Sequence, residues 1–124
     1  MKKNLLILVV DDNLNFVDRM ISLLEEIEQI GQISTATNYD EAHNKFVTES
    51  PDIVLLDINM PGKNGIELLK SIKKNNSVCE VIMLTNHADE YYRLQCLELG
   101  ANNFLDKSNE FHRVPGIIKE LVER

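Results

Sequence analysis

The chain has 124 residues, of which 44% are hydrophobic, and its formal net charge is −7 at pH 7. This length predicts one domain, 1–124, that can bury a core of its own without a disulfide or a structural metal. The negative charge disfavours direct contact with nucleic acid or with an anionic membrane surface.

Cysteine usage and the amino-terminal segment bear on the compartment. Cys79 and Cys96 lack the C-x-x-C spacing and fall within apolar segments, so we expect small buried hydrophobes in a reducing environment. An acidic pair ends the first apolar run before it reaches the length of a signal peptide, and no apolar run is long enough to span a membrane. We therefore expect a cytoplasmic protein with no output domain after Arg124.

The first half of the chain predicts two strand–helix units. The apolar run Leu5–Val10 predicts a strand, and apolar residues at helical spacing then predict a helix over 14–29, ended by Gly31. Gln32–Thr37 is shorter and more polar, as is typical of an edge strand, and it precedes a predicted helix over Tyr39–Glu49.

The second half continues the alternation. Ile53–Leu56 and Val81–Leu84 are continuously apolar, as expected for strands that helices cover on both faces. Helices are predicted at Gly65–Lys74 and Ala88–Leu99, and the weaker run Asn103–Leu105 predicts a second edge strand.

A proline and a glycine interrupt the last helical pattern. Because proline is tolerated in the first turn of a helix, we expect a turn near 109–113 and a helix that starts around Pro115. Alternating strands and helices predict an α/β fold with a parallel sheet. The two weak runs suit the edges of a flavodoxin-like, doubly wound (βα)5 fold, whose five parallel strands are ordered 2-1-3-4-5.

Polar residues stand where four of these strands end. Asp11 and Asp12 follow the first strand, Asp57 the third, Thr85 the fourth, and Lys107 lies just beyond the fifth. The carboxyl ends of parallel strands meet at one edge of a sheet, where open α/β folds bind ligands. Three carboxylates there repel one another unless a cation lies among them, and oxygen ligands suit Mg²⁺ together with a phosphate. The sequence therefore predicts a phosphate-handling site built on carboxylates.

Four segments resemble the receiver domain of two-component response regulators, of the stand-alone chemotaxis type. They are LLILVVDD at 5–12, PDIVLLDINMPGKNG at 51–65, VIMLTNHAD at 81–89 and GANNFLDKS at 100–108. These segments occur in the order and spacing of the family, and the likeness covers essentially the whole chain.

The resemblance implies an aspartyl-phosphate chemistry with Mg²⁺. Asp57 matches the residue that accepts a phosphoryl group from a histidine kinase or phosphotransfer protein. The metal would be held by Asp12 directly, by Asp11 mainly through water, by Asp57, and by the backbone carbonyl of Asn59. From the residues alone, an alternative makes one of the acidic pair the N-cap of the first helix.

Two further residues complete the implied catalytic set. Thr85 would donate a hydroxyl hydrogen bond to the phosphoryl group, and Lys107, expected at the edge of the crevice, would supply a positive charge. Phe104 matches the aromatic switch residue of the family, although simple packing on an edge strand is an equal alternative. The chain would catalyse its own phosphorylation and dephosphorylation but act mainly as a signalling switch.

Three positions depart from the family pattern. Ser108 replaces the usual proline after the lysine, which leaves a trans or a strained cis bond open and makes Ser108 a candidate N-cap. Asn86 replaces a small residue and would narrow access to the phosphoryl group. His87 stands where family members tune dephosphorylation, so it would either steer water or be solvated.

The resulting interpretation is a phosphorylated receiver that acts on a downstream protein. Its switched surface would comprise 88–99, 103–105 and the helix from about Pro115. One alternative is a pseudo-receiver, an interaction module that is not phosphorylated. Another is a small aspartyl-phosphate phosphohydrolase. That chemistry usually needs a second acid two residues after the nucleophile, and Asn59 occupies this position here, which disfavours the alternative.

Overall fold

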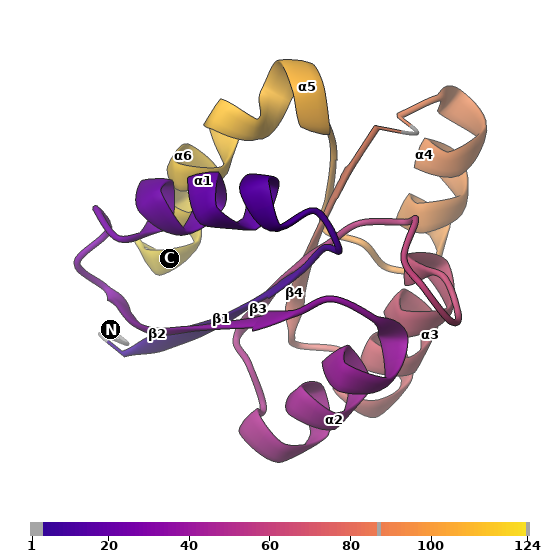
Figure 1. Cartoon of the computed structure of the whole chain (residues 1–124), viewed down its shortest axis with the longest axis horizontal. Coiled ribbons are helices and arrows are strands. Elements are labelled where there is room, and N and C mark those ends of the chain that lie inside the picture. Colours follow the sequence, from indigo (N-terminus) through magenta and orange to yellow (C-terminus); the bar gives the residue numbers. More distant parts are fainter. Residues whose placement is uncertain (1–3, 87, 124) are drawn as a thin grey trace.

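The computed structural model describes residues 4–86 and 88–123, which form an open α/β fold (Figure 1). All strand pairs in its single five-stranded sheet are parallel, and the strand order is β2-β1-β3-β4-β5. The strands are β1 (Leu5–Val10), β2 (Ile30–Ala36), β3 (Ile53–Leu56), β4 (Glu80–Thr85) and β5 (Asn103–Asp106). The predicted fold class and strand order are thus confirmed, with the two polar strands at the edges.

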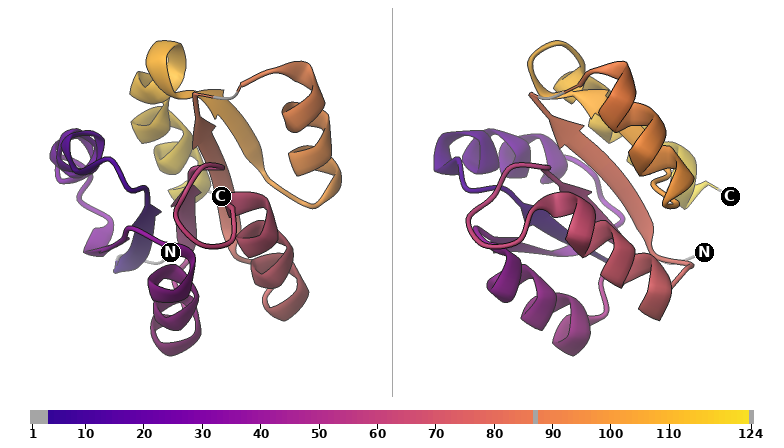
Figure 2. Two further views of the ribbon diagram at one scale, coloured as in Figure 1. Left: turned by 45° about the vertical axis from the view of Figure 1, so that its right-hand side comes forward. Right: turned by 90° about the vertical axis from the view of Figure 1, so that its right-hand side faces the viewer.

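Helices cover both faces of this sheet (Figures 1 and 2). They are α1 (Leu14–Leu24), α2 (Tyr39–Glu49), α3 (Gly65–Asn75), α4 (Glu90–Glu98), α5 (Lys107–Glu110), the 3₁₀ turn η1 (Phe111–Arg113) and α6 (Val114–Val122). The buried side chains of α1 and α6 pack with one face of the central strands, and those of α2, α3 and α4 pack with the other. This double covering explains why β3 is buried at every position.

The first helix is shorter than its apolar pattern predicts. It ends at Leu24, and Gly31 lies inside β2 instead of ending the helix. The backbone N–H of Ile27 donates to the carbonyl of Leu24 in a turn, which still buries the Ile27 side chain. A helix extended to residue 29 would carry the chain past the point where Ile30 pairs with Leu5.

The carboxyl-terminal helical segment starts earlier than expected. Its first turn begins at Lys107, and Asp106 is the N-cap, accepting hydrogen bonds from the backbone N–H groups of Ser108 and Asn109 at 2.9 and 3.3 Å. The prediction of Ser108 as the cap is therefore wrong. The Lys107–Ser108 peptide bond is trans. The final helix starts at Val114 with the proline in its first turn, as predicted to within one residue.

Two further expectations concern burial and length. Both cysteine thiols are buried, as predicted. Burial raises the pKa of Cys79 to about 12 and that of Cys96 to about 11. Among the described residues, no helix is long and apolar enough to cross a membrane.

Candidate functional site

Three carboxylates meet at the carboxyl edge of the sheet. β1 and β3 are neighbours in which Val10 pairs with Leu56, so the residues that follow, Asp11 and Asp57, leave the sheet side by side. Asp12 joins them, and one oxygen of each of the three lies within 4.8 Å of the others. We call Asp11, Asp12 and Asp57 the carboxylate cluster. The first and last are buried, whereas Asp12 is exposed.

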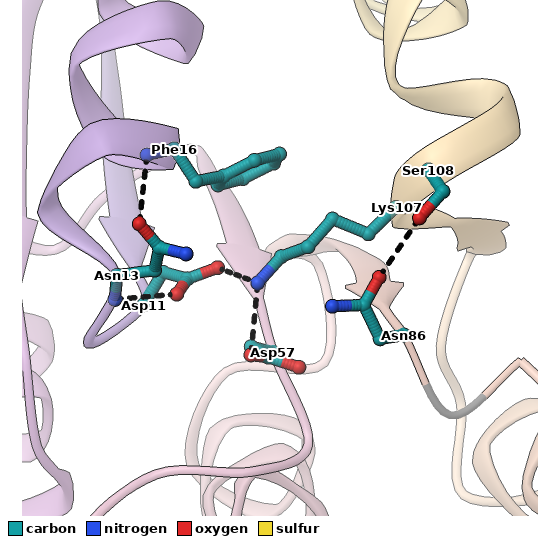
Figure 3. A network of polar contacts seen from close by, with 7 residues as sticks. All are labelled: Asp11, Asn13, Phe16, Asp57, Asn86, Lys107 and Ser108. Carbon is teal, nitrogen blue, oxygen red and sulfur yellow. Dashed lines mark hydrogen bonds and ion pairs between the residues drawn. The ribbon is translucent and has the colours of Figure 1, made fainter.

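Lys107 reaches into this cluster from the end of β5 (Figure 3). Its Nζ atom lies 2.6 Å from Oδ2 of Asp11 and 3.2 Å from Oδ2 of Asp57. The same ammonium lies 4.5 Å from the ring centre of Phe16, close enough for a cation–π contact. Only 9% of the side chain is exposed, so Lys107 is buried within the site. The expectation that it lies at the edge of the crevice is therefore wrong.

Burial and charge compete at this ion pair. Burial raises the pKa of Asp11 above its ordinary value, and the hydrogen bond from Lys107 only partly counters that effect. For Lys107, burial alone would lower the pKa, but the hydrogen bond that it donates to Asp11 and the charges of both aspartates outweigh burial and raise the pKa. The lysine therefore stays charged at neutral pH and is the cation that holds the buried acids together.

The two buried aspartates differ in how their oxygens are used. Both oxygens of Asp11 are engaged, because Oδ1 accepts the backbone N–H of Asn13 at 2.9 Å and Oδ2 pairs with Lys107. Asp57 pairs through Oδ2, whereas its buried Oδ1 has no hydrogen-bond partner within residues 4–86 and 88–123. A buried acceptor without a partner is costly and calls for an explanation. Asp57 thus holds a lone pair available for a ligand or for chemistry.

A cleft of about 410 Å³ opens above the carboxylate cluster, and we call it the central cleft. Its lining residues are Asp12, Asn13, Asp57, Asn59, Met60, Pro61, Asn86 and Lys107. Four of the residues that the sequence assigned to the site, Asp12, Asp57, Asn59 and Lys107, therefore line one cavity. The acids lie at the β1 and β3 ends, whereas a cation and an amide come from the β4 and β5 ends.

The loop between β3 and α3 forms one wall of the central cleft, and two glycines shape it. Gly62 has φ +87°, a left-handed conformation that side chains rarely adopt. At Gly65, a Cβ atom would overlap the carbonyl oxygen of Asp57, because the loop returns close to the strand it left. The backbone N–H of Gly65 donates to the carbonyl of Ile58 at 2.7 Å, which fixes that return.

Thr85 reaches the same edge of the sheet and is buried there. It is the last residue of β4, pairs in register with Asp106, and is fully buried without lining the central cleft. Phe104 lies in β5 opposite Met83 and packs, half-buried, against the core beneath α3 and α4. Packing on the edge strand is therefore observed for Phe104, and a switching role stays a prediction.

An aromatic pair beneath the lysine was not anticipated. Phe16, on the first turn of α1, packs edge to face against Phe111 of η1 with ring centres 6.2 Å apart. The Arg19 guanidinium lies 4.5 Å from the centre of the Phe111 ring. Arg19, Phe111, Phe16 and Lys107 thus form a continuous series of contacts, which we call the aromatic relay. In the sequence, Phe16 looks like any other core residue of an amphipathic helix.

Two asparagines also have roles that the sequence did not reveal. Asn13 is the N-cap of α1 and accepts the backbone N–H of Phe16 at 3.1 Å, so neither acid of the pair caps that helix. Asn86 accepts a hydrogen bond from the Ser108 hydroxyl at 3.2 Å (Figure 3). Two positions that depart from the expected pattern therefore bond to each other. His87 lies outside the described residues.

Comparison with known proteins places the chain in a family. The chain is 32% identical over 120 residues to the alkaline phosphatase synthesis transcriptional regulatory protein PhoP of Bacillus subtilis, covering 95% of this chain and 48% of that protein. The chain thus spans about half the length of that relative. A signal receiver domain of a DNA-binding response regulator from Colwellia psychrerythraea superposes with a TM-score of 0.89 at 28% identity, over 98% of this chain and 100% of that one.

A second solved structure is the BeF3-activated receiver domain of DrrB, a protein of Thermotoga maritima. It has a TM-score of 0.87 and 27% identity, and covers 98% of this chain and 99% of that chain. The family model of the response regulator receiver domain matches residues 7–119, which include every residue of the carboxylate cluster and Lys107. The chain therefore belongs to the response regulator receiver domain family, which serves two-component signalling.

Proposed function

We propose that this receiver domain accepts a phosphoryl group on Asp57 from the phosphohistidine of a histidine kinase or phosphotransfer protein. The observation that carries the proposal is Oδ1 of Asp57. This atom is buried, has no partner among the described residues, and belongs to a side chain that lines the central cleft. A carboxylate oxygen with an available lone pair is what a phosphoryl acceptor requires.

The donor set at this edge suits Mg²⁺. Carboxylate and carbonyl oxygens are the ligands that this ion prefers, and the carboxylate cluster holds an oxygen that is not yet paired. We assign the ion to Asp11, Asp12, Asp57 and the backbone carbonyl of Asn59. When bound, Mg²⁺ would neutralise charge on the phosphoryl oxygens. Because Lys107 occupies Oδ2 of Asp11, it would have to loosen that ion pair as the site fills.

The transfer itself needs one bond exchange. A carboxylate oxygen of Asp57 attacks the phosphorus of the donor, a P–O bond forms, the P–N bond breaks, and the electron pair returns to the imidazole nitrogen. The product is a mixed anhydride, which water hydrolyses to the carboxylate and inorganic phosphate. Lys107 Nζ lies 3.2 Å from Oδ2 of Asp57, and we assign it to pair with a phosphoryl oxygen during both steps.

Signalling would follow from the added charge. A phosphoryl group brings about −1.5 to −2 charge, and we assign Thr85 to donate its hydroxyl to it, which would bias the end of β4. The surface to be switched is that of α4, β5 and the carboxyl-terminal helical segment. Tyr91 and Leu94 of α4 are 71% and 53% exposed, which suits contact with a downstream protein.

One observation favours a second candidate, a pseudo-receiver that is never phosphorylated. Lys107 already pairs with both buried acids, so these two carboxylates share a cation in the absence of a phosphoryl group. Incubation with acetyl phosphate and Mg²⁺, followed by intact mass analysis, separates the two. We expect one added phosphoryl group that is absent in EDTA and absent in Asp57→Asn. An unlabelled parent would favour the pseudo-receiver, and label that persists in Asp57→Asn would refute the assignment of Asp57.

A further inference from the structure

Asn86 lines the central cleft, and its side chain is hydrogen-bonded to Ser108, which does not line that cleft. Asn86 follows β4 and Ser108 follows Lys107 at the start of α5, so their hydrogen bond of 3.2 Å ties two loops that are 22 residues apart in the sequence. Both side chains are exposed, so the bond contributes little to the core. A bond placed there acts on the cleft more than on the fold.

The bond also sets the orientation of the Asn86 amide. Its Oδ1 is used by the Ser108 hydroxyl, and Figure 3 shows Nδ2 on the other side, directed towards Lys107 and Asp57. Asn86 lines the central cleft together with those two residues. An amide nitrogen has two N–H donors, so it can donate to an oxyanion without adding charge.

The β4 and β5 ends of the cleft thus carry donors, opposite the acids of β1 and β3. Lys107 offers an ammonium and Asn86 an amide, whereas Asp12 faces them across the same cavity. A phosphoryl group on Asp57 has negative oxygens on every side. The acidic wall can bind them only through a cation, while the opposite wall can bind them directly.

We propose that Asn86, oriented by Ser108, donates a hydrogen bond to the phosphoryl group on Asp57 and so stabilises the phosphorylated state. Ser108 is a positioning residue: it fixes which end of the amide faces the cleft and does not contact the phosphoryl group. This inference rests on the proposed function, because it needs a phosphoryl group at Asp57. The sequence suggested that Asn86 only narrows access to the phosphoryl group. We infer instead that Asn86 makes an attractive contact with that group.

The two interpretations of Asn86 predict opposite results. If the side chain only obstructs the cleft, Asn86→Ala would leave the affinity for a phosphoryl mimic unchanged or increase it. If it donates a hydrogen bond to a charged group, the same change would weaken binding by about tenfold or more. Asn86→Asp keeps the acceptor for Ser108 but turns an anionic oxygen towards the mimic, so it would weaken binding further than Asn86→Ala does.

The experiment is a titration of the full chain with beryllofluoride in excess Mg²⁺, followed by amide NMR shifts around Asp57. We expect Asn86→Ala to bind about tenfold more weakly than the parent and Ser108→Ala a few-fold more weakly. Ser108→Thr, which keeps the hydroxyl, should restore the parent affinity. In the double variant, Ser108→Ala should add nothing to Asn86→Ala, because its effect acts through that amide. Asn44→Ala, at an exposed asparagine of α2 that does not line the central cleft, is the matched control.

The outcomes separate this inference from the proposed function. A parent that fails to bind beryllofluoride with Mg²⁺ overturns both. A parent that binds, with Asn86→Ala within twofold of it, overturns only the role of Asn86. Full additivity of Ser108→Ala in the Asn86→Ala background overturns the positioning role of Ser108. Amide spectra of the unliganded variants, which should match the parent away from the two loops, establish that the changes leave the fold intact.

Discussion

Lys107 makes its shorter ion pair with Asp11 and not with Asp57: the Nζ–Oδ2 distances are 2.6 and 3.2 Å. The lysine is therefore bound chiefly to a residue that we assign to the metal, and a cation that enters the carboxylate cluster competes with it. Two positive charges that share the same oxygens repel each other. We therefore expect metal binding and the position of the lysine to be coupled through one carboxylate.

The first prediction concerns Lys107→Met, which keeps the length of the side chain but removes its charge. Two buried carboxylates would lose their cation, so without metal the free energy of unfolding should fall by about 3 kcal/mol at pH 7. Mg²⁺ should recover most of that loss and bind more tightly than in the parent. Urea unfolding in EDTA and in Mg²⁺ measures both effects. Lys63→Met, at an exposed lysine, is the control, and equal stability of the two variants would contradict the prediction.

The second prediction is the pH dependence of that contribution. The pKa of Lys107 is raised in the fold above its ordinary value of 10.5 by its aspartate partners, against the effect of burial. The stability that it contributes is therefore fully present below pH 10.5 and is lost as the pH rises through the folded pKa. The difference in unfolding free energy between the parent and Lys107→Met, measured in EDTA, should be constant from pH 7 to 9 and shrink at higher pH. A difference that grows with alkalinity would be inconsistent with this ion pair.

The third prediction concerns Asp12, the exposed member of the carboxylate cluster. Asp12→Ala should abolish Mg²⁺-dependent amide shifts near Asp57, because the site loses its most accessible oxygen ligands. Stability without metal should change by less than about 0.5 kcal/mol, as is usual for exposed positions. Asp18→Ala, at an exposed acid of α1, should bind Mg²⁺ like the parent. Parent-like Mg²⁺ binding by Asp12→Ala would remove Asp12 from the metal site.

The fourth prediction concerns Thr85, which is buried at the end of β4. Its hydroxyl is assigned to respond to the phosphoryl group and not to attack it. Thr85→Ala should therefore still be labelled by acetyl phosphate, whereas the shifts of Phe104 and its neighbours on addition of beryllofluoride should largely disappear. Thr48→Ala, at a surface threonine bonded to its own helix, should respond like the parent. Full shifts at Phe104 in Thr85→Ala would mean that the signal takes another route.

The ends of the strands were predictable from the sequence because an apolar run stops there and a polar residue follows. A buried strand must be apolar, and its polar successor must leave the sheet at the carboxyl edge, so the gathering of Asp11, Asp57 and Lys107 followed from topology. The extent to which each of these side chains is buried did not follow from the topology. Lys107 looked like a surface lysine, yet two buried acids make burial of its ammonium favourable.

Contacts between side chains of distant segments carry no local pattern. The Asn86–Ser108 bond joins two loops through residues that are each ordinary for a turn. The early end of α1 has a similar origin, because residues 25–29 contain good helix formers and only the pairing of Leu5 with Ile30 ends the helix. Tertiary geometry overrides local preference at both places.

The aromatic relay also limits which substitutions natural variants of this chain can carry. Phe16 and Phe111 come from opposite ends of the chain, yet one ring touches the ammonium of Lys107 and the other supports that ring. A smaller residue at 111 would leave the Phe16 ring without its neighbour. The effect would then pass from Phe16 to Lys107 and from Lys107 to Asp57. Among natural variants of this chain, positions 16, 19 and 111 should therefore change together, even though none of them bears the chemistry.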